Sequence, residues 1–277
     1  GQIVDGLDAS LVFSVDYALV CITALLASGL TLVSGFGLGT ILMPAFAVFF
    51  PLPAAIAATA IVHLANNGFK LALVGRHADR ATLLRFGVPA VLASFAGAAL
   101  LALLENVAPL AAYSIGTHTC RVTIVKLVIA AIMLGFAALE LSPRFSKLEF
   151  DLRYQPVGGV LSGFFGGLSG HQGSLRSAFL VRAGLSKESF VATGCVIAVM
   201  VDVARLLVYG VDAWRTHAQQ ARAEGVGFGL IAAACLSAFV GAYLGAKLVR
   251  KITIEAVRVV VAGMLAIIAI LLGTGII

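Results

Sequence analysis

Two stretches interrupt apolar segments with glycines: Ser28–Thr40 (SGLTLVSGFGLGT) and Ser162–Ser174 (SGFFGGLSGHQGS). They align at a constant separation of 134 residues, which also relates Ala58, Thr59 and Val62 to Ala192, Thr193 and Val196. A duplicated hydrophobic segment broken by glycines is typical of membrane transporters whose substrate site lies between two repeats. The sequence therefore predicts a transport protein built from two related halves.

The composition supports a membrane location. Apolar residues make up 61% of the chain and charged residues 12%, and the mean hydropathy is +1.06. The net charge of +6 does not indicate a nucleic-acid partner, because the cations lie in short loops between apolar runs, where they determine topology. The four cysteines are isolated from one another and from the histidines, so we expect no metal, no cofactor and no disulfide.

A transmembrane helix needs about 20 apolar residues. We expect full-length membrane helices over 53–75, 82–104, 121–141, 186–209, 226–248 and 254–275. The interrupted segments cover 15–50 and 156–183. In the second, each arm of about 11 residues gives roughly 16 Å of helix, about half the thickness of a bilayer. This length favours a hairpin that enters and leaves by the same face of the membrane. The predicted fold class is an all-α polytopic membrane protein with two inverted repeats, each a broken-helix hairpin followed by three transmembrane helices.

Loop charges support this topology. With both broken segments as hairpins, the basic loops lie on one side: Arg76, Arg80 and Arg85; Arg144, Lys147 and Arg153; Lys247, Arg250 and Lys251. The other side holds the acidic N-terminus and the loops 105–118 and 210–225. By the positive-inside rule the basic side is cytoplasmic. The predicted parts are an N-terminal segment (1–14), a first repeat (15–141), a cytoplasmic linker (142–155) and a second repeat (156–277).

The breaks suggest an anion site. The second half-helices begin near Gly39-Thr40 and Gly173-Ser174, and a helix N-terminus presents unpaired N–H groups and a partial positive charge that suit an oxyanion. The glycines alternatively serve only to permit close helix packing.

Polar stripes follow both hairpins. His63, Asn66, Asn67 and Lys70 share one face of the first following helix, and Asp202 and Arg205 lie on its counterpart. Polar groups in lipid are expensive, so these stripes should face the protein interior or a water-filled path. The alternatives are that Lys70 and Arg205 extend toward the membrane surface, or that Asp202 simply pairs with Arg205 three residues on.

His171, Gln172 and Arg176 distinguish the second break from the first. They could tune substrate choice, with His171 as a proton carrier and Arg176 binding an oxyanion through two hydrogen bonds, or they could close the break through an internal network. The complete set of candidate substrate-binding residues is Gly37, Gly39, Thr40, His63, Asn66, Asn67, Lys70, Ser169, Gly170, His171, Gln172, Gly173, Ser174, Arg176, Asp202 and Arg205.

Two other function classes match parts of the sequence. Gly167-Leu168-Ser169-Gly170 matches the GxSG pattern of intramembrane serine proteases, but such an enzyme needs a histidine base on a later, neighbouring helix, and only His171 and His217 follow. A cation channel or transporter could use Asp202 as a ligand, yet Lys70, Arg176 and Arg205 outnumber that acid and favour anions.

The run Gly35-Phe36-Gly37-Leu38-Gly39-Thr40-Ile41-Leu42-Met43-Pro44 and its second copy, Gly163–Gly170 followed by Ala192-Thr193, resemble the sulfite exporter TauE/SafE family of membrane transporters. The resemblance covers about residues 15–275 and departs at His171–Arg176, where polar residues replace the usual glycines. It implies a secondary transporter, not an enzyme, that exports sulfite or a small organosulfonate across the bacterial cytoplasmic (inner) membrane. The expected partners are this small anion and membrane lipid; a homo-oligomer is compatible with the sequence.

Overall fold

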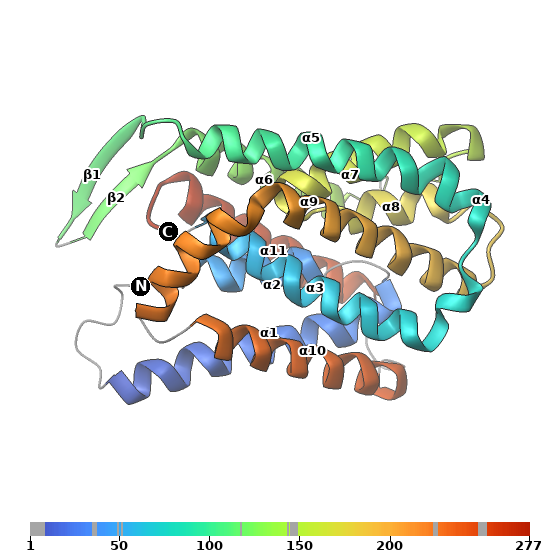
Figure 1. The fold of residues 1–277 in the computed structure, drawn as a ribbon, viewed down its shortest axis with the longest axis horizontal. Helices are drawn as coiled ribbons and strands as arrows, with labels where there is room; N and C mark the ends of the chain where they lie inside the picture. The colour runs from blue at the N-terminus through green and yellow to red at the C-terminus, as the bar shows by residue number, and fades with distance from the viewer. Residues whose placement is uncertain are drawn as a thin grey trace.

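The chain is almost entirely helical (Figure 1) in a computed structural model that describes residues 9–34, 38–48, 50, 52–116, 118–142, 144, 149–223, 227–248 and 254–277. The helices of the first half are α1 (Ala9–Ser34), α2 (Leu38–Ala47), α3 (Leu52–Val74), α4 (Arg80–Thr82), α5 (Val88–Glu105) and α6 (Ile124–Leu141). Those of the second half are α7 (Gln155–Ser169), α8 (Gly173–Leu180), α9 (Lys187–Ala223), α10 (Gly227–Leu248) and α11 (Ile254–Gly273). Strands β1 (Ala111–Ile115) and β2 (His118–Val122) form an antiparallel hairpin.

The second broken segment is a helical hairpin, as predicted. Helix α7 ends at Gly170, whose φ of 81° is left-handed and suits glycine, and α8 begins at Gly173. The end of α8 returns to the start of α7: the Phe150 and Phe179 rings stack at 4.0 Å, and a Cβ added at Gly158 would overlap the Phe179 ring. The first segment likewise divides into α1 and α2, although its break at 35–37 lies outside the described residues.

Helices α5 and α7 run parallel in close contact. A Cβ added at Gly159, Gly163 or Gly167 would overlap the carbonyl oxygen of Phe86, Ala90 or Ser94, respectively. Both sets of positions ascend together at four-residue intervals, which shows that the helices are parallel. Only glycine allows this approach of backbone to backbone, as in other small-residue helix interfaces in membranes.

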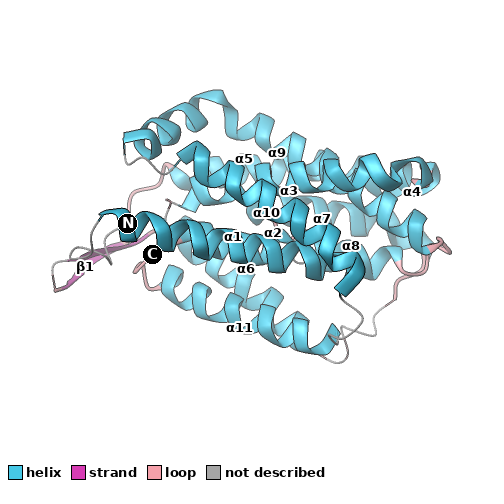
Figure 2. Ribbon diagram, turned by 90° about the horizontal axis from the view of Figure 1, so that it is seen from below, coloured by secondary structure: helices cyan, strands magenta, loops and turns pink. Residues whose placement is uncertain are grey.

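The two ends of the helical body differ. At one end, hereafter the basic end, α3 terminates and α5 and α7 begin; exposed Arg76, Arg80 and Arg85 lie here. The opposite, β-hairpin end holds β1, β2 and the C-terminus, because Tyr113 donates a hydrogen bond to the Thr274 carbonyl. Figure 2 shows the strands and α4 at opposite ends of the molecule.

The distribution of side chains is inverted relative to a water-soluble protein. Leu92, Leu103, Leu207, Leu236 and Ile267 are each more than 60% exposed, whereas charged side chains are buried in the interior. Three described helices are long and apolar enough to cross a membrane, namely Arg80–Glu105, Ile124–Leu141 and Lys187–Tyr209. Exposed leucines around a polar interior are expected where lipid is the surrounding solvent.

Three sequence predictions need correction. The class is not purely α, because the predicted 105–118 loop and the start of the 121–141 span contain the β-hairpin, which turns at Gly116 with a φ of 61°. The predicted 210–225 loop is wrong, since α9 continues to Ala223. The stretch 218–223 (AQQARA) consists of strong helix formers and has no proline to end the helix. Helix α1 also begins at Ala9, six residues before the predicted hairpin.

Candidate functional site

The two breaks meet in the interior. Gly39, in the first turn of α2, lies against Gly170 of the second break: a Cβ added at Gly39 would be 3.3 Å from the Gly170 carbonyl oxygen. The same Cβ would be 3.8 Å from the His63 ring of α3. Glycine at position 39 therefore allows the two halves of the chain to approach at the point where both broken segments turn.

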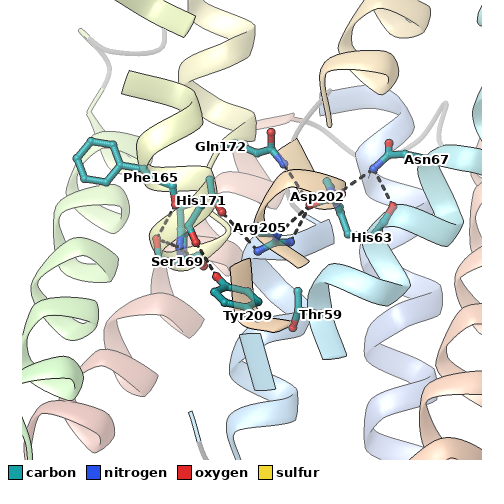
Figure 3. A network of polar contacts seen from close by, with 12 residues as sticks. Thr59, His63, Asn67, Phe165, Ser169, His171, Gln172, Asp202, Arg205 and Tyr209 are labelled. Atoms are coloured by element: carbon teal, nitrogen blue, oxygen red, sulfur yellow. Dashed lines mark hydrogen bonds and ion pairs between the residues drawn. The ribbon is translucent and has the colours of Figure 1, made fainter. Parts of the chain in front are cut away.

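A charged cluster lies beside this contact (Figure 3). Asp202 of α9 is fully buried, and both of its carboxylate oxygens have partners. Oδ2 is 2.6 Å from His63 Nδ1; Oδ1 accepts from Arg205 Nε at 3.1 Å and lies 2.8 Å from Arg205 Nη2. Since an ionised carboxylate only accepts hydrogen bonds, Nδ1 is the protonated nitrogen of His63. Asn67 supports this ring by donating to the His63 carbonyl at 2.8 Å.

Helix α9 also fixes the end of α7. Arg205 Nη1 donates to the Gly166 carbonyl at 3.4 Å, and the Tyr209 hydroxyl donates to the Gly167 carbonyl at 2.5 Å. Both carbonyls belong to the last turn of α7, and the Gly166 carbonyl also accepts the Gly170 N–H at 3.0 Å. Arg205 therefore neutralises the charge of Asp202 and also links this carboxylate to the α7–α8 hairpin.

Gln172 connects this cluster with a second cation. Its Nε2 lies 3.5 Å from Asp202 Oδ1, while its Oε1 accepts from Arg176 Nη1 at 3.4 Å. Its backbone carbonyl accepts from Ser162 at 2.9 Å, which holds the break against α7. The Gln172 amide thus joins the two residues: its nitrogen faces the Asp202 carboxylate, and its oxygen faces the Arg176 guanidinium.

Lys70 and Arg176 form a group nearer to the basic end. Both are buried, and both lie close to the buried Cys195 thiol of α9. A Cβ added at the neighbouring Gly194 would be 3.5 Å from Arg176 Nε. Within the described part of the chain, no group accepts a hydrogen bond from the Lys70 ammonium or forms an ion pair with it.

The remaining break residues have internal partners. His171 Nδ1 lies 3.1 Å from the Ser169 carbonyl and 3.0 Å from its hydroxyl, and the His171 ring stacks on Phe136 at 5.3 Å. Ser174, in the first turn of α8 after Gly173, donates a hydrogen bond to the buried carboxylate of Glu140 on α6. The sequence reasoning missed Glu140, although a single acid within the apolar span 121–141 was an available signal.

One predicted residue, Asn66, has a partner outside this cluster, and two others fall where the structure gives no description. Asn66 is buried and accepts from Ser28 at 3.0 Å, so it links α3 to α1. Gly37 lies outside the described residues. Thr40 belongs to α2, but its side chain is likewise outside what the structure describes. The other predicted residues gather around the two breaks and the facing surfaces of α3 and α9.

The Ser169–His171 pair does not form a nucleophile and base. The Ser169 hydroxyl donates to the Phe165 carbonyl at 3.0 Å, so His171 Nδ1 must donate toward Ser169 instead of accepting its proton. A serine protease requires the opposite direction of transfer. The geometry argues against the protease alternative.

Residues 20–272 match the family model described as Sulfite exporter TauE/SafE. The chain belongs to this family. It is therefore a multi-pass membrane transporter and not an enzyme, and the TauE/SafE resemblance recognised from the glycine motifs is confirmed. No curated protein and no solved structure matched the chain.

Proposed function

We propose that this TauE/SafE protein exports a small sulfur oxyanion, sulfite or an organosulfonate, across the bacterial inner membrane. The observation that carries the proposal is the charge balance between the breaks. Lys70, Arg176 and Arg205 are buried there beside one carboxylate, Asp202. The other buried carboxylate near the breaks, Glu140, lies against Ser174 and Arg258. Burying charge is costly unless it is paired, and a small anion would supply the missing negative charge.

The packing favours an inverted repeat. Helix α9 begins at the basic end, where Thr193 accepts from the Asp79 backbone, so α10 begins at the other end. Helix α1 runs parallel to α10, because Tyr17 faces Gly229 and Leu25 faces Gly241. Thus α1 enters from the β-hairpin end and α7 from the basic end. This opposite entry is expected for inverted repeats with a site at their interface.

The proposed site combines the breaks with the polar faces of α3 and α9. Backbone N–H groups at the starts of α2 and α8 and the side chains of Lys70 and Arg176 would bind the oxygens of the anion. A cation substrate is less well served, because both oxygens of Asp202 already have partners. With the basic end in the cytoplasm, the membrane potential favours efflux of a monoanion by about 2.3 kcal/mol per 100 mV.

The test is a thermal-shift screen of the purified full chain against sulfite, thiosulfate, sulfate, sulfoacetate, isethionate and taurine, followed by transport into inside-out vesicles. We expect at least one sulfur anion to stabilise the protein and to be transported into the vesicles. The choline salt controls should do neither. The variant Gly39→Leu should abolish transport, because its side chain would fill the contact between the breaks, whereas Gly39→Ala adds a single carbon at 3.3 Å from its nearest neighbour. Absence of any response to these anions would refute the proposal.

A further inference from the structure

The buried cations occupy two levels along α3 and α9. His63, Asp202 and Arg205 form the level beside the breaks. Lys70 lies two turns farther along α3, and Cys195 lies two turns earlier on α9, so each is displaced by about 10 Å toward the basic end. Arg176 joins this outer level through its proximity to Lys70 and Cys195. The two levels differ in how completely their charges are satisfied.

The level beside the breaks is closed. Asp202 lies against Arg205, His63 and Gln172 at 2.6–3.5 Å. Arg205 is also directed at the Gly166 carbonyl and is 1% exposed. The positive and negative charges of this level compensate each other within the chain, so it needs no external ion.

The outer level has an uncompensated cation. The Lys70 side chain is buried, yet no described residue accepts a hydrogen bond from its ammonium or pairs with it. An ammonium is strongly hydrated and has three donors, so Lys70 Nζ has donors open to water or an anion. The adjacent Arg176, whose Nη1 donates to Gln172, places a second positive charge close to Lys70.

We infer that Lys70 and Arg176 form an anion-binding subsite on the basic side of the breaks, the first position that a sulfur oxyanion reaches from the cytoplasm. This inference rests on the proposed function and the proposed orientation. The planar guanidinium of Arg176 can bind two oxygens of a sulfonate or sulfite, and Lys70 can bind a third as a point charge. Gln172 is a positioning residue, since its Oε1 orients the guanidinium at 3.4 Å.

Variants of the two cations test the subsite. Lys70→Met removes the charge and keeps an unbranched stem, and Arg176→Gln removes the second charge. Arg182→Gln is the matched control, because Arg182 pairs with Glu149 on the surface and its side chain is 58% exposed. Titration calorimetry of the purified full chain would use sulfite, thiosulfate and isethionate as probes. We expect Lys70→Met and Arg176→Gln each to weaken binding at least tenfold, about 1.4 kcal/mol, and Arg182→Gln to bind like the wild type.

The melting temperature without ligand separates binding from a structural role. Replacing an unpaired buried cation with an apolar side chain of similar volume should leave that temperature unchanged or raise it; a structural Lys70 would make it fall. Wild-type affinity in both Lys70→Met and Arg176→Gln, or a lower melting temperature with wild-type affinity in Lys70→Met, overturns the subsite while leaving the proposed function intact. If the wild type binds none of the three probes, the proposed function fails, and the subsite falls with it.

Discussion

Among single residues, Asp202 connects distant parts of the chain, because its carboxylate brings together side chains from α3 and α9. It lies 139 positions from His63 in sequence, yet the two side chains approach to 2.6 Å. It also holds Arg205, which in turn is directed at the last turn of α7. The pairing of Asp202 with Arg205, one of the two interpretations open from the sequence, is thus present, and it extends into a network that joins α3, α7 and α9.

This network makes Arg205→Ala strongly destabilising. The substitution leaves Asp202 buried without its cation, and removal of one partner from a buried pair costs about 3–5 kcal/mol. The double variant Asp202→Asn with Arg205→Gln removes both charges and retains hydrogen-bonding groups, so it should cost much less, below about 2 kcal/mol. Thermal and denaturant unfolding in detergent would compare the two. Equal destabilisation of the single and double variants would argue against a charge pair as the main contribution.

At the element scale, the glycines of α7 have two separable roles. Gly170 adopts a positive φ and ends the helix, whereas Gly159, Gly163 and Gly167 provide a flat face for α5. Both roles were available as alternatives from the sequence, where the glycines could mark a break or close packing. The structure assigns them to different positions of one segment.

Gly163→Ala tests the packing role. Its Cβ would overlap the Ala90 carbonyl oxygen, so α5 and α7 must separate, at a cost of about 1–3 kcal/mol as for other overpacked interiors. Gly135→Ala on α6 is the matched control, because nothing lies within 4 Å of its added Cβ; it should be neutral or stabilise by up to about 1 kcal/mol. Unfolding of both variants in the same detergent provides the comparison. A Gly163→Ala variant as stable as Gly135→Ala would mean that the helix contact is looser than described.

At the scale of the whole molecule, orientation follows from charge. Exposed Arg76, Arg80 and Arg85 lie at the basic end, whereas the β-hairpin end carries the exposed Arg121 and Ile115. Cytoplasmic loops are enriched in Lys and Arg. The basic end should therefore face the cytoplasm and the β-hairpin the outside.

Thiol labelling would test this orientation. In a variant with Cys21, Cys120, Cys195 and Cys235 replaced by Ser, single cysteines at positions 80 and 115 report the two ends. An impermeant maleimide should label Ile115→Cys in intact cells and Arg80→Cys only after permeabilisation. Labelling of both from outside would contradict their placement on opposite sides of the membrane, and labelling of Arg80→Cys alone would reverse the orientation.

Composition and local sequence patterns were enough to identify the class of protein, the approximate helical spans and the position of the second break. These features depend on local composition: long apolar runs require a lipid environment, and glycine at Gly170 permits a backbone conformation that ends a helix. The polar stripe from His63 to Lys70 was also evident, because helical periodicity places those side chains on one face. The periodicity of this stripe does not predict which side chain of another helix each of its residues contacts.

Only the tertiary structure decided the partners. Asp202 with His63, Ser174 with Glu140, and Gly163 with Ala90 are separated by long stretches of chain, and their contacts depend on how rigid helices rotate and cross. The same packing leaves Arg205 paired and Lys70 without a described partner, although both looked alike as cations on matching helices. The β-hairpin and the extension of α9 were missed because short turn segments and helix ends carry weak local signals. Local physics thus selected the elements, and their mutual packing decided which charged side chains pair with one another.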